Sequence, residues 1–202
     1  SSRSADDTLV GTWVAHPATW VVAVDVDSGA RVAFGSAAAP PAHIRDAVRA
    51  SWAIPGWFPP VEIGGRRYVD GGVFSPTSAD LVAPLGLDEV VVVAPMASSN
   101  PGPRKGLGRV EGLVRRRMCR TLDAEVAILR DAGMRVLRIE PEGDDLEVMG
   151  PNFMDGARRL RVLESSLRTC RRTVSRALER DGFDRASRRG GAPLTFAQVK
   201  GA

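Results

Sequence analysis

The residues with the clearest chemical potential are Asp70, Gly71 and Gly72, which follow the short apolar segment Tyr68-Val69. A carboxylate becomes an effective general base in an apolar, partly dry setting, because desolvation raises its basicity. Such a base could take the proton of a serine hydroxyl, which is otherwise a poor nucleophile. The two glycines allow either a close backbone approach or a positive φ behind the carboxylate. Asp-Gly-Gly also closes strands as an Asx turn, so a purely structural role is the alternative.

A nucleophile to match this base is not evident in the chain. A nucleophilic serine often stands in a Gly-x-Ser-x-Gly turn between a strand and a helix, and this pattern does not occur in the 202 residues. Ser75 and Ser78 lie close to Asp70 without flanking glycines, so we interpret them as cap or turn residues. The sequence therefore contains a candidate base and lacks its partner.

Predicted strands and helices alternate along the chain and would hold Asp70 at the exit of a strand. Valine-rich segments predict strands, Gly64-Gly65 predicts a tight hairpin before Asp70, and apolar residues three and four apart predict helices that pack through one face. In chain order we expect strands over residues 20–25 and 30–34, a helix over 44–51, strands over 61–63 and 67–69, a short helix over 78–84, a buried strand over 89–94, a long helix from 107 to Gly133, a strand over 134–139 and a long helix over 160–177. This order predicts an α/β fold.

Composition narrows the function classes. An apolar fraction of 44% in 202 residues suffices for the core of one domain. The first residues are polar and no uncharged apolar run reaches membrane-spanning length, so we expect a cytoplasmic protein. Residues 101–202 hold 22 Lys and Arg against 6 in residues 1–100, but these alternate with acids and lack interleaved aromatics, so we expect no nucleic-acid partner. No Cys or His cluster suggests a metal, and no cofactor is expected.

Several segments, taken in order, resemble the patatin-like phospholipases. The resemblance rests on Trp20-Val-Val-Ala-Val-Asp25, on Ser51-x-Ala-Ile-Pro-Gly-x-Phe-Pro-Pro60, on Tyr68-Val-Asp-Gly-Gly-Val73 and on Asp88-Glu-Val-Val-Val-Val93. The late segment from Ile139-Glu-Pro to Met149-Gly-Pro-Asn-Phe-Met-Asp155 resembles a bacterial, actinobacterial branch of the family. The resemblance thus extends from Trp20 to the second long helix.

The resemblance implies a lipid acyl hydrolase, of the phospholipase A type or a general esterase, with a Ser–Asp dyad. Asp70 would be the catalytic base, and an upstream segment would supply the serine and the oxyanion loop, so we expect the 202-residue chain alone to be inactive. Gly71, Gly72, Pro55 and Ser51 would support the site or contact the substrate, with a helix-end cap as the alternative role of Ser51. A catalytically inactive module that binds lipid or a protein partner is the alternative function.

The resemblance also implies a three-layer α/β sandwich, with a central sheet between helices and incomplete in this chain. We expect residues 1–183 to be the C-terminal part of a single patatin-like domain and residues 184–202 to be a flexible tail. The expected partners are a phospholipid or another lipid ester, the N-terminal segment as a separate piece, and a membrane surface contacted peripherally.

The loop from Trp52 to Pro60 combines three aromatic rings with three prolines. We expect it to be mostly buried, with one aromatic at the rim of a pocket into which Asp70 points. If the rings were instead exposed, they would form a surface for a lipid interface or an acyl chain.

Overall fold

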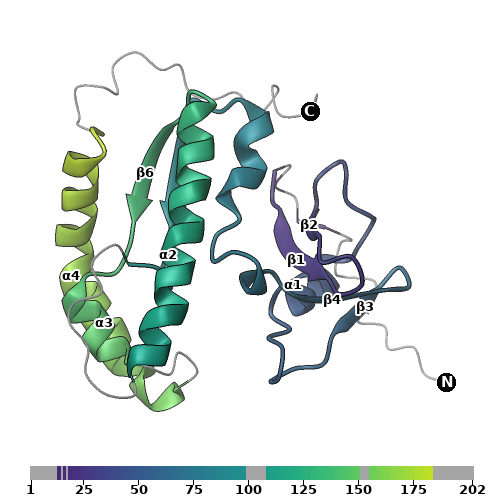
Figure 1. Ribbon diagram of the computed structural model, residues 1–202, viewed down its shortest axis with the longest axis horizontal. Coiled ribbons are helices and arrows are strands. Elements are labelled where there is room, and N and C mark those ends of the chain that lie inside the picture. The colour runs from purple at the N-terminus through teal and green to yellow at the C-terminus, as the bar shows by residue number, and fades with distance from the viewer. Residues whose placement is uncertain (1–12, 15, 17, 99–107, 151–154, 184–202) are drawn as a thin grey trace. The chain divides into compact units, whose positions relative to one another are not determined.

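A computed structural model describes residues 13, 14, 16, 18–98, 108–150 and 155–183, with the side chains of residues 108–115 excepted (Figure 1). The chain divides into two compact units, the first ending at Leu81 and the second beginning at Val82. The predicted tail over residues 184–202 lies outside the described residues.

The first unit is built on a four-stranded antiparallel sheet with the strand order β2-β1-β4-β3. Its elements are β1 (Val21–Asp25), β2 (Arg31–Phe34), α1 (Ile44–Ser51), β3 (Val61–Ile63), β4 (Arg66–Asp70) and the 3₁₀ turn η2 (Gly71–Val73). Gly64 and Gly65 both have positive φ, and they connect β3 to β4 as the predicted hairpin. In the register between β1 and β4, Ala23 pairs with Asp70.

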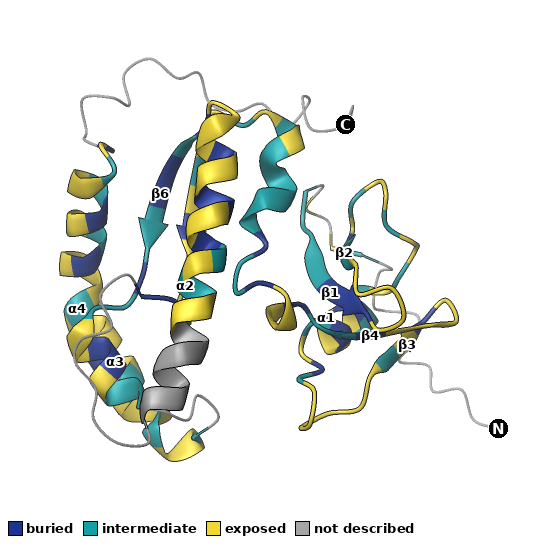
Figure 2. Ribbon diagram, in the orientation of Figure 1, coloured by how far each residue is buried: buried dark blue, intermediate teal, exposed yellow. Residues whose placement is uncertain are grey.

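The core of this unit lies between α1 and the sheet (Figure 2). Phe34 and Tyr68 are its largest buried side chains, and their rings meet edge to face with centroids 5.0 Å apart. Ala47 and Ala50 lie fully buried on α1, and such small side chains let a helix approach a sheet closely. The helix therefore ends close to the strands, so that the loop after Ser51 starts beside the sheet.

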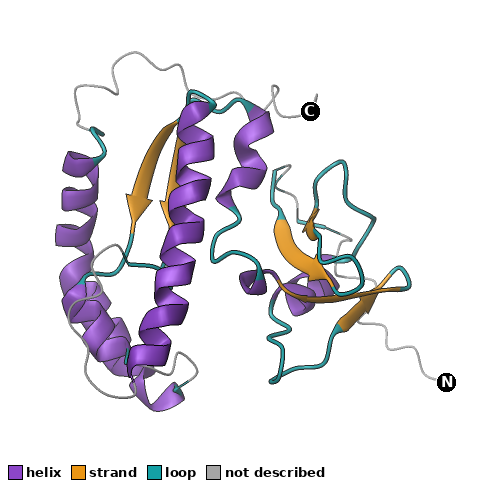
Figure 3. Ribbon diagram, in the orientation of Figure 1, coloured by secondary structure: helices purple, strands orange, loops and turns teal. Residues whose placement is uncertain are grey.

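The second unit contains two parallel strands and three helices. They are β5 (Glu89–Val93), α2 (Gly108–Asp131), β6 (Arg135–Ile139), α3 (Gly143–Met149) and α4 (Arg159–Arg180), with the 3₁₀ turn η4 (Gly156–Arg158) before α4. A further 3₁₀ segment, η3 (Ala79–Leu85), runs through the point at which the two units divide. β5 and β6 pair in parallel from Glu89↔Arg135 to Val93↔Ile139. Strands and helices thus occur in both units, which confirms the mixed α/β class (Figure 3). The single central sheet of a three-layer sandwich stays a prediction.

Two burial expectations for the second unit are wrong. β5 was expected to be fully buried, but Val91 and Val93 are exposed and only Val92 is buried. Because side chains alternate along a strand, covering one face leaves every second valine open. Within the described residues, β5 pairs with β6 alone.

The apolar stripe of α4 also differs from the expectation of core packing. Leu160, Leu163 and Leu167 are exposed, whereas the helix buries Ser165, Thr173 and Ala177. The inward face is fixed by polar contacts with α3, where Thr169 donates a hydrogen bond to Asp145 at 2.7 Å. The sequence analysis missed α3 itself, whose visible signal is a capping box between Glu142 and Asp145.

Candidate functional site

Asp70 is the last residue of β4 and lies beside the start of the aromatic loop. Its backbone N–H donates a hydrogen bond to the Ala53 carbonyl at 3.0 Å, and Ala53 follows Ser51 by two residues. The β3–β4 hairpin returns the chain toward the end of α1, as its position in the sequence predicts. The candidate base and the loop from Trp52 to Pro60 are therefore neighbours in the first unit.

The Asp70 side chain is half-buried and its carboxylate is oriented by the turn that follows it. Oδ1 accepts the Gly72 N–H at 2.8 Å, so that Asp70 caps η2. In the part of the chain that the structure describes, no donor contacts Oδ2. This is the geometry of an Asx turn, and it also leaves one carboxylate oxygen able to accept a proton from a nearby hydroxyl.

The two glycines after Asp70 serve a close approach rather than a positive φ. A Cβ on buried Gly71 would lie 2.7 Å from the Val22 carbonyl oxygen of β1, closer than packed atoms come. A Cβ on Gly72 would lie 3.3 Å from Oδ1 of Asp70. Gly71 thus fits the turn against the sheet, and Gly72 leaves room for the carboxylate.

The other predicted site residues occupy the surroundings of Asp70 without a shown chemical role. Ser51 is the half-buried last residue of α1, and Pro55 is exposed in the loop. Ser75 is buried, and its Oγ accepts the N–H groups of Thr77 and Ser78 at 3.2 and 2.9 Å. That contact confirms the turn role expected for Ser75. The supporting roles of Ser51 and Pro55 stay predictions.

The aromatic rings of the loop are exposed, so the expectation that they are mostly buried is wrong. Trp52 is 68% exposed, Trp57 61% and Phe58 48%. The loop closes on itself, because the Ile54 carbonyl accepts both the Trp57 and the Phe58 N–H at 3.0 Å. This tight turn, with Gly56 at positive φ, directs the rings outward rather than into a core.

A second exposed apolar segment of the first unit consists of Val73, the last residue of η2, and Phe74, which follows it. The Arg31 guanidinium lies 4.5 Å from the centroid of the Phe74 ring and pairs with Asp80 at 2.6 Å. The candidate base is therefore followed in the chain, as well as preceded, by exposed apolar side chains.

A comparison with known families agrees with this geometry. The family model described as patatin-like phospholipase matches residues 14–83, which are 70 of the 202 residues. The matched range contains β1 to β4, the aromatic loop and the Asp70-Gly71-Gly72 turn. The bacterial, actinobacterial branch stays a prediction. Residues 14–83, with Asp70 at the strand exit, are therefore similar to the patatin-like phospholipases, a family whose members act on lipid substrates.

Proposed function

We propose that the protein is a lipid acyl hydrolase that uses a Ser–Asp dyad, with Asp70 as the base and the serine supplied by an upstream segment. The observation that carries the proposal is the half-buried Asp70 carboxylate, held by one backbone donor at a strand exit within the matched range. Asp70 would accept the serine proton through Oδ2 while the serine attacks the ester carbonyl. The bond to the alcohol would break as the alcohol leaves with the proton that Asp70 had accepted. A water molecule that gives a proton to Asp70 would then attack the acyl-enzyme, release the acid and restore the serine.

Neighbouring groups support this role of Asp70 by fixing where its carboxylate can lie. The Gly72 N–H holds Oδ1, and the close fit of Gly71 against Val22 fixes the turn. A base that is already oriented loses little conformational freedom when it meets the hydroxyl. Ser51 and Pro55, at the end of α1 and in the loop, would shape the space in front of the carboxylate.

We also propose a cytoplasmic location with peripheral contact to a membrane through the exposed loop. Trp and Phe rings favour the boundary between headgroups and acyl chains. Arg45 and Arg49 on α1 have side chains that are 61% and 65% exposed, and such basic groups attract anionic lipid. Among the described helices, none has the length and apolarity to cross a bilayer.

A catalytically inactive module that binds lipid or a protein partner is the second candidate function. The exposed aromatic rings favour it as much as they favour the enzyme, because they need no chemistry to bind a lipid surface. The two candidates differ in what Asp70 does, so the test is directed at that residue.

Asp70→Asn tests the dyad in the form of the protein that includes the upstream segment. The amide is nearly isosteric but cannot take the serine proton, so we expect ester hydrolysis to fall about 10²- to 10⁴-fold with an unchanged circular dichroism spectrum. Asp27→Asn is the matched control, because Asp27 is an exposed carboxylate paired with Arg67, and should keep full activity.

The 202-residue chain alone should not hydrolyse a short nitrophenyl ester, since it carries no nucleophile in a Gly-x-Ser-x-Gly turn. If the longer Asn variant stays active, Asp70 is only a turn residue and the dyad is wrong. If the longer protein binds lipid vesicles yet hydrolyses no ester with Asp70 intact, the inactive module is the better description.

A further inference from the structure

A polar cavity of about 480 Å³ lies at the C-terminal end of β6 in the second unit. Its lining includes Ser98, Arg138, Glu140, Thr173, Arg176 and Arg180. The volume falls within the range of small-molecule sites. The carboxyl ends of parallel strands are also where open α/β sheets bind ligands. None of these residues lies in the range that the family model matches.

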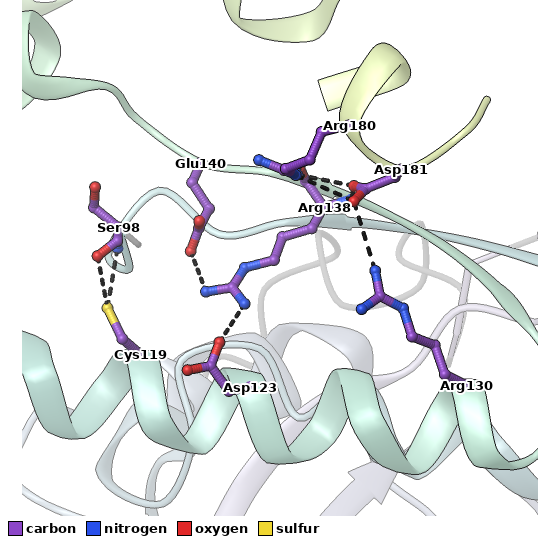
Figure 4. Close-up of polar contacts among 8 residues, drawn as sticks. All are labelled: Ser98, Cys119, Asp123, Arg130, Arg138, Glu140, Arg180 and Asp181. Atoms are coloured by element: carbon purple, nitrogen blue, oxygen red, sulfur yellow. Dashed lines mark hydrogen bonds and ion pairs between the residues drawn. The ribbon is translucent and has the colours of Figure 1, made fainter. Parts of the chain in front are cut away.

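Arg138 is held rigidly at the base of this cavity. Its side chain is 12% exposed and bridges Asp123 of α2 and Glu140, the latter at 2.6 Å (Figure 4). Its backbone N–H donates to Asp181 at 2.9 Å. A guanidinium fixed on both sides presents its remaining N–H in one direction.

Arg180 is fixed in the same way by Asp181. Its Nε and Nη2 donate to the two Asp181 oxygens at 3.1 and 2.8 Å, and Nη2 also donates to the Arg138 carbonyl. Burial raises the pKa of Asp181, but the hydrogen bonds from Arg180 and from the Arg138 N–H outweigh it and lower the pKa overall. Asp181 therefore stays ionised and keeps Arg180 in place beside the cavity.

Some hydrogen-bond donors of the cavity lining have no acceptor among the residues that the structure describes. The buried Arg138 Nε and Thr173 Oγ1 have no partner among the described residues, and a buried donor left unpaired lowers stability. Arg176 uses Nη1 for Glu142 at 2.8 Å, which leaves its other N–H groups available. The two glutamates of the lining, in contrast, already accept hydrogen bonds from arginines. Glu140 accepts one from Arg138, and Glu142 accepts one from Arg176.

The charges of the lining agree with this excess of donors. Among the lining residues alone, three arginines, at positions 138, 176 and 180, stand against two glutamates, at positions 140 and 142. Asp123 and Asp181, which are not part of the lining, pair with Arg138 and Arg180. A ligand that supplies several acceptor oxygens and negative charge would satisfy both conditions. Arginine forks match phosphate oxygens particularly well.

We propose that this cavity binds a phosphate monoester, with the phosphate group between Arg176 and Arg180 and toward Thr173. The space beyond the phosphate suits a small organic group. The same phosphomonoester chemistry occurs in soluble metabolites and in the headgroup of phosphatidic acid, so the test separates these two sources.

The experiment titrates the 202-residue chain at constant ionic strength with glycerol 3-phosphate, with inorganic phosphate and with phosphatidylcholine vesicles that contain phosphatidic acid. We expect saturable binding of the two soluble ligands, seen as shifts of arginine Nε–H signals in NMR spectra.

Arg176→Gln should weaken the binding of both soluble ligands about tenfold or more, since a hydrogen bond to a charged group contributes about 1.5–3 kcal/mol. The matched control is Arg168→Gln, because Arg168 is an exposed arginine of α4 outside the lining and its loss removes the same charge.

Thr173→Val separates a ligand site from a structural defect. Replacing a buried, unpaired hydroxyl by a methyl should keep or raise the melting temperature, while the loss of a ligand contact should weaken glycerol 3-phosphate binding several-fold. Binding that Arg176→Gln and Arg168→Gln reduce equally, or the absence of binding both to millimolar soluble phosphates and to the phosphatidic-acid vesicles, would overturn the proposal. Binding to the vesicles alone would identify a lipid headgroup as the source of the ligand.

Discussion

Two aspartates on neighbouring strands have different environments. Asp25 is fully buried, its Oδ1 accepts the Asp27 and Ser28 N–H groups, and its Oδ2 accepts Arg66 Nη1 at 2.9 Å. Asp70 is half-buried and has one backbone donor. The placement of Asp70 at the exit of β4 was predictable from its motif and the hairpin. The burial of the Asp25 carboxylate was not, because an aspartate before a turn shows no sign in the sequence of being buried.

Asp25 should make the stability of the protein sensitive to acid. Its pKa is lowered chiefly by the Ser28 backbone N–H, against the opposing effect of burial, with Arg66 adding to the lowering. A carboxyl whose folded pKa lies below its ordinary 3.8 stabilises the fold above that pH, and the contribution is lost as the pH falls through the folded value. Asp25→Asn should therefore lower the free energy of unfolding near neutral pH.

Urea unfolding over a pH series measures this effect. The difference between wild type and Asp25→Asn should stay constant near neutral pH and shrink as the pH falls below about 4. Asp27→Asn is the control, since Asp27 is an exposed partner of Arg67, and it should differ little from wild type at any pH. A difference for Asp25→Asn that persists unchanged in acid would show that the ionised carboxylate contributes nothing.

At the scale of elements, local patterns predicted the existence and bounds of most strands and helices, but not which face of each element is buried. α1 has the predicted bounds, because its periodicity is local and Pro55 follows it closely. The orientation of α4 depends on its contact with α3, as in the bond from Thr169 to Asp145. That contact joins residues 24 positions apart, so apolar spacing within α4 could not indicate which face is covered.

Substitutions of two leucines should show which helix faces are in the core. Leu167 on α4 is 69% exposed, whereas Leu129 on α2 is fully buried. Leu167→Gln should change the free energy of unfolding by less than about 0.5 kcal/mol. Leu129→Ala should lower it by about 2–5 kcal/mol, because it removes buried methyl groups and leaves a cavity. A loss for Leu167→Gln comparable to that of Leu129→Ala would mean that the leucine stripe of α4 is covered in solution.

At the scale of the whole molecule, the similarity of residues 14–83 to the patatin-like family and the α/β class were predictable, and the division into two compact units was not. The motifs that carry the family lie mostly within residues 14–83, and alternating strands and helices indicate the class wherever they occur. The division at Leu81 and Val82 depends on which segments pack together. The cavity near Arg138 could not be predicted from the sequence either, because its residues come from separate segments and carry no motif.

The single domain expected over residues 1–183 stays a prediction, and the cooperativity of unfolding tests it. Parallel strands are usually stable only when both faces of the sheet are covered, and Val91 and Val93 leave one face of β5 open. An isolated pair of strands with one uncovered face has little stability of its own in water. We therefore expect residues 1–183 to unfold as one cooperative unit.

The chain carries its own probes for this test. All four tryptophans, at positions 13, 20, 52 and 57, belong to the first unit, whereas the long helices α2 and α4 belong to the second. In a cooperative domain, Leu129→Ala should lower the urea midpoint seen by tryptophan fluorescence as much as that seen by helical ellipticity. Phe34→Ala, in the core of the first unit, should likewise shift both signals together. If each substitution shifts only the signal of its own unit, the two units unfold separately and the single-domain prediction is wrong.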